Sequence, residues 1–334
     1  MSARKLLNKP LDVVDEALEG LELAHPGLLR WNRDPSYVRR ARPAGPDKVA
    51  LVSGGGSGHE PLHTGFIGTG MLDAAVPGAV FASPTADQII AATQAVGRAA
   101  GVVHVVKNYT GDVLNFQIAA ECVADEGLHV ERVLVDDDLA TDSDLADGPG
   151  RRGTAAVIAV EKMCGAAAER GAGIREVAAL GRTIVTRSRT MAFALAACTH
   201  PDQEQPSFEL ADYEVEMGVG IHGERGRERA PFGTADDLVD SVLTPIVETL
   251  GVARGHSVLA ITNGLGSTHP LELHIAHRAV ALQLAARGIH LARSLVGPYV
   301  TALDMAGCSI TLVHVNDDLV TLWDEPVRTP ALTW

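Results

Sequence analysis

Val49-Ala50-Leu51-Val52-Ser53-Gly54-Gly55-Gly56-Ser57-Gly58-His59-Glu60-Pro61 is the stretch around which the chain is organised. It begins as an apolar run typical of a buried strand and continues into four glycines, two serines and a histidine. A glycine-rich turn lets backbone N–H groups approach an oxyanion or a polyol, because glycine has no Cβ. The spacing matches neither a P-loop nor the dinucleotide fingerprint. Taken alone, the stretch fits a tight turn with a surface histidine about as well as a binding site.

The composition is that of a globular protein with an acidic surface. The 334 residues are 46% hydrophobic, carry a formal charge of −14 and are long enough for two domains with separate cores. Acidic charge with only 4% aromatic residues argues against binding nucleic acid or an anionic membrane. The four cysteines form no CxxC pair, residues 1–7 lack the long apolar run expected of a signal peptide, and no apolar run is long enough to span a membrane. We therefore expect free thiols and a cytoplasmic location.

Strands alternate with helices through the first half of the chain. Residues 102–106 are a β-branched run typical of a buried strand, residues 130–135 are predicted as another strand, and residues 113–126 have helical spacing. This alternation predicts an α/β fold with a mostly parallel sheet in an N-terminal domain, residues 1–190. A second, smaller α/β domain is expected over residues 191–334. Because ligands bind beyond the carboxyl ends of parallel strands, the glycine-rich loop and residues 107–112 are expected at one sheet edge.

Three further assignments depend on local patterns. Residues 31–46 are polar and proline-rich, which predicts irregular structure. Residues 174–197 have the pattern of one or two helices. Residues 310–315 and 320–323 flank Asn-Asp-Asp, which predicts a terminal hairpin.

Polar residues sit among glycines in three stretches, residues 53–61, 107–116 and 218–224. With residues 150–153, 303–305 and 323–324, these stretches resemble, in order and over nearly the whole chain, the dihydroxyacetone kinase K subunit of the phosphotransferase-system-dependent type. The stretch 263–270 departs from the family pattern. Gly264 stands where a second Asn is more common, and His269 is unusual, which bears on oligomer contacts or on the substrate.

The resemblance implies a phosphotransferase that converts dihydroxyacetone (glycerone) to dihydroxyacetone phosphate in glycerol metabolism. By this resemblance, an imidazole nitrogen of His222 holds the ketone as a hemiaminal. Glycerol has no carbonyl group and cannot form this adduct, so it is excluded as a substrate. Asp112 would accept the proton of the attacking hydroxyl, and His59 would assist it. The other substrate contacts implied are Gly56, Ser57, Gly58 and Lys107.

The resemblance also implies partners and a phosphoryl donor. Mg²⁺ and ADP or ATP are expected on a separate, helical L subunit, which a phosphohistidine carrier of the phosphoenolpyruvate phosphotransferase system recharges. The family's single-chain members carry a helical nucleotide domain after this point in the sequence, and we expect no tightly bound cofactor and no metal site in this chain. The acidic runs 136–138 and 317–318 could hold Mg²⁺, but such runs are more often solvated. A homodimer is expected.

Other interpretations of the same residues stay open. Asp112 also fits a helix cap, His222 a turn histidine and Lys107 a solvated strand end. Arg151 and Arg152 are better explained as ion-pair partners of nearby acids than as phosphate ligands.

Two other functions also stay open. One is a kinase for a longer ketose such as erythrulose, which depends on pocket size. The other is a hydroxyketone-sensing co-activator, which in this family keeps the hemiaminal histidine and loses the base. The presence of His59 and Asp112 beside His222 argues against the co-activator.

Overall fold

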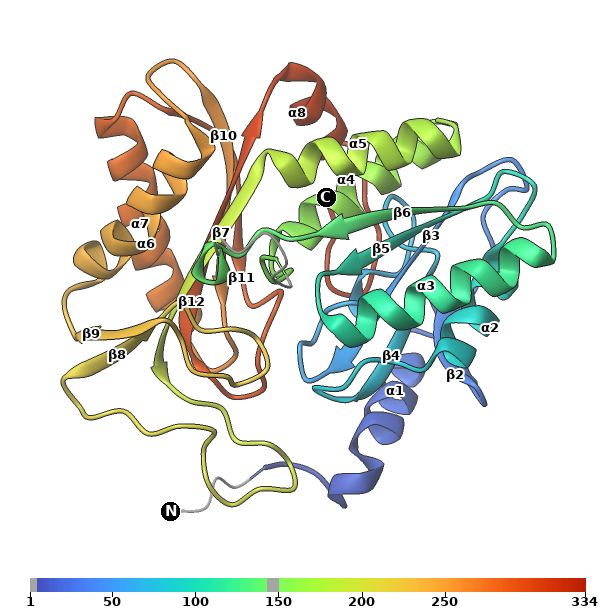
Figure 1. The fold of residues 1–334 in the computed structure, drawn as a ribbon, viewed down its shortest axis with the longest axis horizontal. Coiled ribbons are helices and arrows are strands. Elements are labelled where there is room, and N and C mark those ends of the chain that lie inside the picture. The colour runs from blue at the N-terminus through green and yellow to red at the C-terminus, as the bar shows by residue number, and fades with distance from the viewer. Residues whose placement is uncertain (1–4, 143–149) are drawn as a thin grey trace. The chain divides into compact units, whose positions relative to one another are not determined.

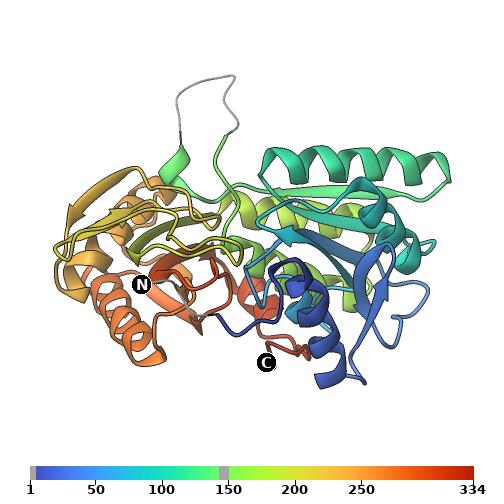
Figure 2. The ribbon, with the colours of Figure 1, turned by 90° about the horizontal axis from the view of Figure 1, so that it is seen from below.

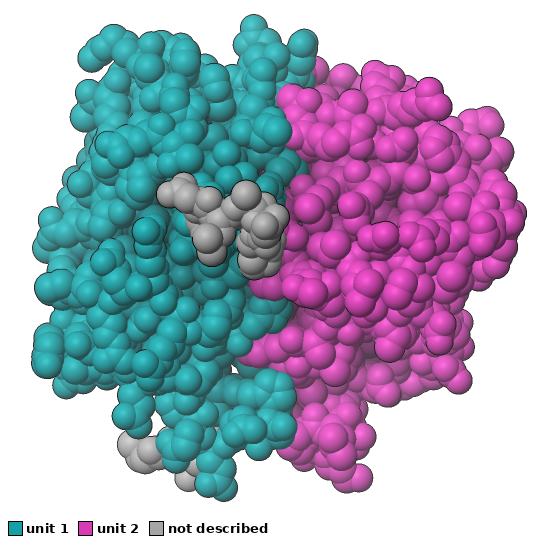
Figure 3. Space-filling model, viewed as in Figure 1, with its two compact units in different colours: residues 1–4, 136–156, 184–320 teal, residues 5–135, 157–183, 321–334 magenta. Residues whose placement is uncertain are grey.

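A computed structural model describes residues 5–142 and 150–334 of the chain. The elements gather into two compact units, which Figure 3 shows in teal and magenta. Unit 2 consists of Lys5–Val135, Val157–Thr183 and Thr321–Trp334, and unit 1 is built from Asp136–Ala156 and Ile184–Val320. Each unit is discontinuous in the sequence, whereas the sequence favours one boundary between residues 190 and 191.

The sheet of unit 2 has the strand order β1-β2-β4-β3-β5-β6. Its strands are β1 (Leu29–Arg33), β2 (Ser36–Arg40), β3 (Ala50–Ser57), β4 (Ala74–Val80), β5 (Val102–Lys107) and β6 (Val130–Val135). Strands β4, β3, β5 and β6 run parallel, and β1 and β2 add an antiparallel hairpin at one edge. The prediction of a mostly parallel sheet is confirmed.

Helices cover both faces of this sheet (Figure 1). Helices α2 (Ala86–Val96) and α3 (Thr110–Asp125) pack side by side on one face, and α4 (Ala156–Glu169) and α5 (Ile174–Thr186) lie on the other. Helix α1 (Val13–Ala24) packs against β1. All eight residues of β3 are buried, as expected for a parallel strand covered on both faces.

The chain returns to unit 2 in its last described segment. Arg328 forms a β-bridge with Thr69, which lies between β3 and β4 in the sequence. The Lys162 ammonium on α4 lies 5.2 Å from the ring centroids of both Trp323 and Trp334. Residues 321–334 are thereby built into unit 2 by backbone pairing and by cation–π contacts.

The sheet of unit 1 has the strand order β11-β10-β12-β7-β8-β9. Its strands are β7 (Ser188–Ala196), β8 (Glu214–Met217), β9 (Glu228–Pro231), β10 (Ser257–Gly264), β11 (His290–Gly297) and β12 (Ala306–Val315). Strands β10 and β11 run parallel, and the remaining pairs run antiparallel. Helices α6 (Ala235–Leu250) and α7 (Pro270–Ala286) pack side by side, drawn in orange in Figure 2, and share one apolar core with the sheet. The α/β class is confirmed here too.

Three of the local predictions are wrong. Residues 31–46 contain most of the β1–β2 hairpin. The second half of 174–197 is β7, whose alternation of buried and less buried residues is masked by its alanines. The expected terminal hairpin is α8 (Asp317–Trp323), because Asn316 Oδ1 accepts from Leu319 N at 3.1 Å and caps a helix start.

Across residues 5–142 and 150–334, none of the helices combines the length and the apolar character needed to cross a bilayer.

Candidate functional site

The glycine-rich stretch lies at the carboxyl end of β3. The strand continues to Ser57, so most of the run that the sequence predicts as a turn is extended strand. A Cβ on Gly56 would lie 2.7 Å from the backbone nitrogen of Ala82, so glycine allows the neighbouring chain to approach. Gly58 has φ +100°, a left-handed conformation that favours glycine, and the chain leaves the sheet there.

Two polar side chains of this stretch are held within unit 2. The Ser57 hydroxyl donates to Gly78 O at 2.7 Å, so it is engaged by the fold. The His59 side chain belongs to a residue that is 1% exposed, and its ring stacks on Phe81 with centroids 5.3 Å apart. Phe81 is a contact that the sequence did not reveal, since an aromatic residue in a turn carries no specific signal.

Lys107 and Asp112 come together at the same edge of the sheet. Lys107 ends β5, and its ammonium lies 3.6 Å from Asp112 Oδ2 and 3.4 Å from Gly54 O. Asp112 lies in the first turn of α3, where the helix dipole favours a carboxylate. The N-cap of α3 is Tyr109 without a side-chain hydrogen bond, so Asp112 is not the helix cap. Both charged residues are buried, which also excludes a solvated Lys107.

One oxygen of this carboxylate remains available. Asp112 Oδ1 is buried and has no hydrogen-bond partner within the described part of the chain. A Cβ on Gly55 would lie 2.3 Å from the Lys107 ammonium and 3.4 Å from Asp112 Oδ2. Glycine at position 55 therefore makes room for this buried ion pair. The Asp112 carboxylate of the pair can accept a proton from a bound hydroxyl group.

A further buried group supports Lys107 and was missed from the sequence. His63 Nε2 lies 3.2 Å from the Lys107 ammonium, and His63 Nδ1 lies 2.6 Å from Glu161 Oε1. Ser53 donates its proton to Val105 O, so its oxygen, 3.0 Å from Nδ1, can only accept. Nδ1 therefore carries the proton and Nε2 accepts from Lys107. No motif marks His63 or Glu161, because their pairing spans 98 residues.

Burial sets the charge of these supporting residues. Burial, with smaller effects of Lys107 and His59, lowers the pKa of His63 well below its ordinary value of 6.5, so the ring is neutral. Burial raises the pKa of the Glu161 carboxyl to about 8, despite the opposing effects of Ser53 and Lys107.

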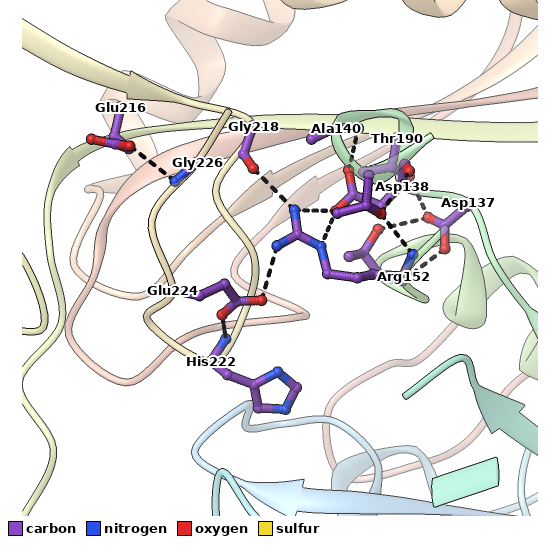
Figure 4. Close-up of polar contacts among 12 residues, drawn as sticks. Asp137, Asp138, Ala140, Arg152, Thr190, Glu216, Gly218, His222, Glu224 and Gly226 are labelled. Atoms are coloured by element: carbon purple, nitrogen blue, oxygen red, sulfur yellow. Dashed lines mark hydrogen bonds and ion pairs between the residues drawn. The ribbon is translucent and has the colours of Figure 1, made fainter. Parts of the chain in front are cut away.

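His222 lies in unit 1, on the segment that joins β8 to β9. Gly218 and Gly223 adopt φ +72° and +77°, so two glycines allow the turns on either side of the histidine. A Cβ on Gly223 would lie 2.8 Å from Cys198 Sγ. The backbone N–H of His222 donates to Glu224 Oε2 at 2.8 Å, which Figure 4 shows.

Arg152 joins this segment to the acidic run that follows β6. Its Nη1 donates to Glu224 Oε1, its Nη2 to Gly218 O, and its Nε to Asp138 Oδ2 (Figure 4). Arg151 pairs with Asp136 at 3.0 Å. The interpretation of both arginines as ion-pair partners of nearby acids is confirmed.

The interpretation of residues 136–138 as a solvated run is wrong. Asp137 is fully buried and accepts from Thr154 N at 2.7 Å and from the hydroxyl groups of Thr154 and Thr190. Asp138 is 1% exposed, and burial raises its pKa to about 6 although Arg152 opposes the change. These carboxylates are used in joining the elements of unit 1. In the described residues, no group of three or more His, Cys, Asp or Glu side chains is placed to hold a metal ion.

The structure explains the unusual loop before α7. His269 is the N-cap of this helix, and its Nδ1 accepts from Leu271 N at 3.2 Å while Glu272 completes a capping box. A Cβ on Gly264 would lie 2.9 Å from Leu273 Cδ1, so a side chain there would push against α7. Both departures from the family pattern are accommodated by the packing of α7.

The predicted residues therefore divide between the two units. Unit 2 carries Gly56, Ser57, Gly58 and His59 after β3, with Lys107 and Asp112 after β5, and unit 1 carries His222. The prediction that the loops after β3 and β5 share one sheet edge is confirmed by the contact of Lys107 with Gly54 O and Asp112. The individual roles of these residues stay predictions.

Comparisons with known proteins agree over nearly the whole chain. A family model described as the Dak1 domain matches residues 19–331. The dihydroxyacetone-binding subunit of the PEP-dependent dihydroxyacetone kinase of Escherichia coli (strain K12) is 43% identical over 355 residues, with 99% of each chain covered.

Solved structures give the same picture of the fold. The crystal structure of the dihydroxyacetone kinase of C. freundii in its native form has a TM-score of 0.89 at 35% identity, and the match covers 99% of this chain. This chain spans 60% of the length of that kinase. A dihydroxyacetone kinase operon co-activator also has a TM-score of 0.89, at 30% identity over 95% of this chain and 97% of the co-activator.

Proposed function

Because this chain belongs to the Dak1 family, we propose that it is the dihydroxyacetone-binding subunit of a dihydroxyacetone kinase. Such an enzyme is a phosphotransferase whose acceptor is an alcohol group. The observation that carries the proposal is the buried Asp112 carboxylate, held by Lys107 with Oδ1 unoccupied by any described hydrogen-bond donor. A buried, oriented carboxylate is the group that phosphoryl transfer to a hydroxyl needs.

His222 is proposed to hold the ketone covalently. A ring nitrogen attacks the carbonyl carbon, and the C–N bond forms as the C=O π bond breaks. The carbonyl oxygen gains a proton and the ring loses one, so the hemiaminal forms without net proton uptake. Dihydroxyacetone is small and uncharged, so ordinary contacts give limited affinity, and the covalent bond adds to it. Glycerol has no carbonyl and is rejected.

Asp112 is proposed to accept the proton of the terminal hydroxyl as its oxygen attacks phosphorus. His59 assists through a hydrogen bond, and Lys107, 3.6 Å from Oδ2, orients the carboxylate. Backbone groups of Gly56 and Gly58, together with residue Ser57, are proposed to contact the substrate. Positioning of this kind supplies most of the rate in phosphoryl transfer, because the reaction demands in-line geometry more than a strong base.

The phosphoryl group is proposed to come from a nucleotide on a separate L subunit. Mg²⁺ and ADP or ATP would be bound there, and a phosphohistidine carrier of the phosphoenolpyruvate system would recharge the nucleotide. This chain is proposed to act as a homodimer. The proposal predicts no product from this chain with Mg²⁺, ATP and dihydroxyacetone, and product when the L subunit and its donor are added. Robust ATP-dependent turnover by this chain alone would overturn the donor assignment.

Two substitutions test the assigned roles separately. His222→Ala should raise the KM for dihydroxyacetone and abolish the adduct seen by mass spectrometry. Asp112→Asn should keep the adduct and abolish turnover, because an amide cannot accept the proton. Wild-type KM in the first variant, or turnover within a few-fold of wild type in the second, would remove the corresponding role.

The co-activator remains a second candidate because one solved co-activator has the same fold at 30% identity. Asp112 and His59 are both buried at the sheet edge. A protein that only senses the ketone needs no catalytic base, so the presence of these two residues favours the kinase. A substrate panel including erythrulose, with detection of the phosphate ester, distinguishes the candidates. Formation of any sugar phosphate excludes a purely regulatory role.

A further inference from the structure

The segment that carries His222 is poorly suited to holding a side chain still. Residues 218–226 lie outside β8 and β9 and include four glycines, at positions 218, 220, 223 and 226. Glycine loses more conformational freedom on ordering than any other residue. A nucleophile on such a segment needs contacts that fix the segment from outside it.

Glu224 supplies a first contact from within the segment, to which an outside group can bind. Its Oε2 accepts from the backbone N–H of His222 at 2.8 Å, and the two residues are separated by only Gly223. A Cβ on Gly220 would lie 1.8 Å from Glu224 Oε1 and 2.6 Å from Arg152 Nη1. The carboxylate therefore folds back across the segment, into the space that glycine leaves at position 220.

Arg152 supplies the contact from outside the segment and holds both ends of the turn. Nη2 donates to Gly218 O at 3.0 Å, before His222, and Nη1 donates to Glu224 Oε1 at 3.0 Å, after it. Figure 4 shows the guanidinium between these two groups, with the His222 ring extending away from them. Because a guanidinium is planar and its donors are fixed, both contacts are set at once.

Asp138 fixes the arginine in turn. Arg152 Nε donates to Asp138 Oδ2 at 2.8 Å, and Ala140 N donates to Asp138 Oδ1 at 3.0 Å. The Arg152 backbone oxygen accepts from Asp138 N at 3.0 Å. The arginine is therefore anchored through its main chain and its side chain to a carboxylate that is 1% exposed.

We propose that Arg152, acting through Glu224, is a positioning residue that sets the attack geometry of His222 on the ketone. This inference rests on the proposed covalent role of His222. Arg152 does not touch the ketone in this assignment; it fixes the backbone from which the imidazole projects. A fixed nucleophile loses less entropy when it forms its adduct. We therefore expect Arg152 to affect mainly the capture of the ketone, and the phosphoryl-transfer step less.

The test compares two adjacent arginines in the complete system with the L subunit and its phosphoryl donor. Arg152→Lys keeps the positive charge and removes the two guanidinium donors that bind Gly218 and Glu224 at once. It should raise the KM for dihydroxyacetone by on the order of tenfold, while kcat changes by less than about threefold. Arg151→Lys is the matched control, because Arg151 pairs instead with Asp136 and Asp142. Its KM should stay close to that of the wild type.

A double-mutant cycle separates positioning from general stability. If Arg152 acts through His222, Arg152→Lys should add no further increase in KM to a His222→Ala protein. An additive increase, or equal KM values for Arg152→Lys and Arg151→Lys, overturns the inference. An unchanged KM in His222→Ala alone would instead remove the proposed covalent role. These two failures are distinguishable because each appears in a different variant.

Glu224→Gln keeps the test decisive if the Arg152 variant does not fold. In the amide, an NH2 group replaces one of the two accepting oxygens, so either His222 N or Arg152 Nη1 loses its acceptor. The KM should rise by about threefold or more, again only when His222 is present. A KM equal to that of the wild type overturns the inference.

Discussion

Replacing Glu161 by Gln should make unit 2 more resistant to unfolding at alkaline pH. Glu161 is fully buried, and burial raises its pKa from the ordinary value of 4.5 to about 8. Between these pH values the folded chain keeps a proton that the unfolded chain has released. The free energy of unfolding therefore falls as the pH rises through this range. The rise in pKa corresponds to about 5 kcal/mol above pH 8, at about 1.4 kcal/mol for each pH unit.

Gln at position 161 has no proton to lose, so this part of the pH dependence should disappear. Its amide oxygen can still accept from His63 Nδ1. Because burial lowers the pKa of His63, this residue makes stability rise as the pH increases toward about 6.5 and level off above it. That effect is present in both proteins and cancels in their difference. The free energy of unfolding of the variant should therefore increase steadily, relative to that of the wild type, between about pH 5 and pH 8.

Urea unfolding followed by tryptophan fluorescence at pH 5, 7 and 9 measures this difference. The three tryptophans of the chain, Trp31, Trp323 and Trp334, all belong to unit 2, so the signal reports that unit. Glu121→Gln, on the exposed side of α3, is the control and should follow the wild type at every pH. If the curves for Glu161→Gln and wild type stay parallel from pH 5 to 9, Glu161 is not protonated in the folded chain and the reasoning is wrong.

Three further predictions follow from particular contacts. Gly55→Ala should displace the Lys107 ammonium and lower kcat by about tenfold or more, since the new methyl needs its space; unchanged kcat, with wild-type melting as the control, would contradict this. Asp137→Asn should lower the free energy of unfolding by about 2–4 kcal/mol, because the amide leaves buried donors unpaired; a loss below about 0.5 kcal/mol in chemical denaturation would count against it. Ellman's reagent should label Cys122 quickly and the other thiols only after denaturation, because Cys122 alone among the four cysteines is exposed; a second fast thiol would refute this.

The parallel sheet of unit 2 could be predicted because valine-rich segments alternate with segments of helical spacing. The β-branched run over 102–106 has few alternatives to a buried strand, whereas β6 is buried only at Val133 and Val135. β7 could not be recognised in the same way, since Ala192 and Ala194 fit a helix as well as a strand. The pairing of β7 with β12, more than a hundred residues later, decides between the two.

The site could be predicted where chemistry and local sequence coincide. Asp112 and Lys107 lie within six residues, so their meeting after β5 follows from one strand end and one helix start. His63 and Glu161 could not be found in this way, and neither could the contact of Arg152 with the segment that carries His222. Each acts through a partner far along the chain, and nothing in the residues around them differs from an ordinary buried or ion-paired side chain.

The return of residues 321–334 to unit 2 has a consequence for synthesis on the ribosome. Arg328 pairs with Thr69, and Lys162 lies between Trp323 and Trp334. The chain emerges from its N-terminal end, so most of unit 2 is made long before the segment that completes it. Unit 1, whose residues end at Val320, can finish first, while an unfinished surface of unit 2 stays exposed to chaperones. Released chains truncated before residue 321 should therefore leave unit 2 sensitive to protease, whereas unit 1 is protected.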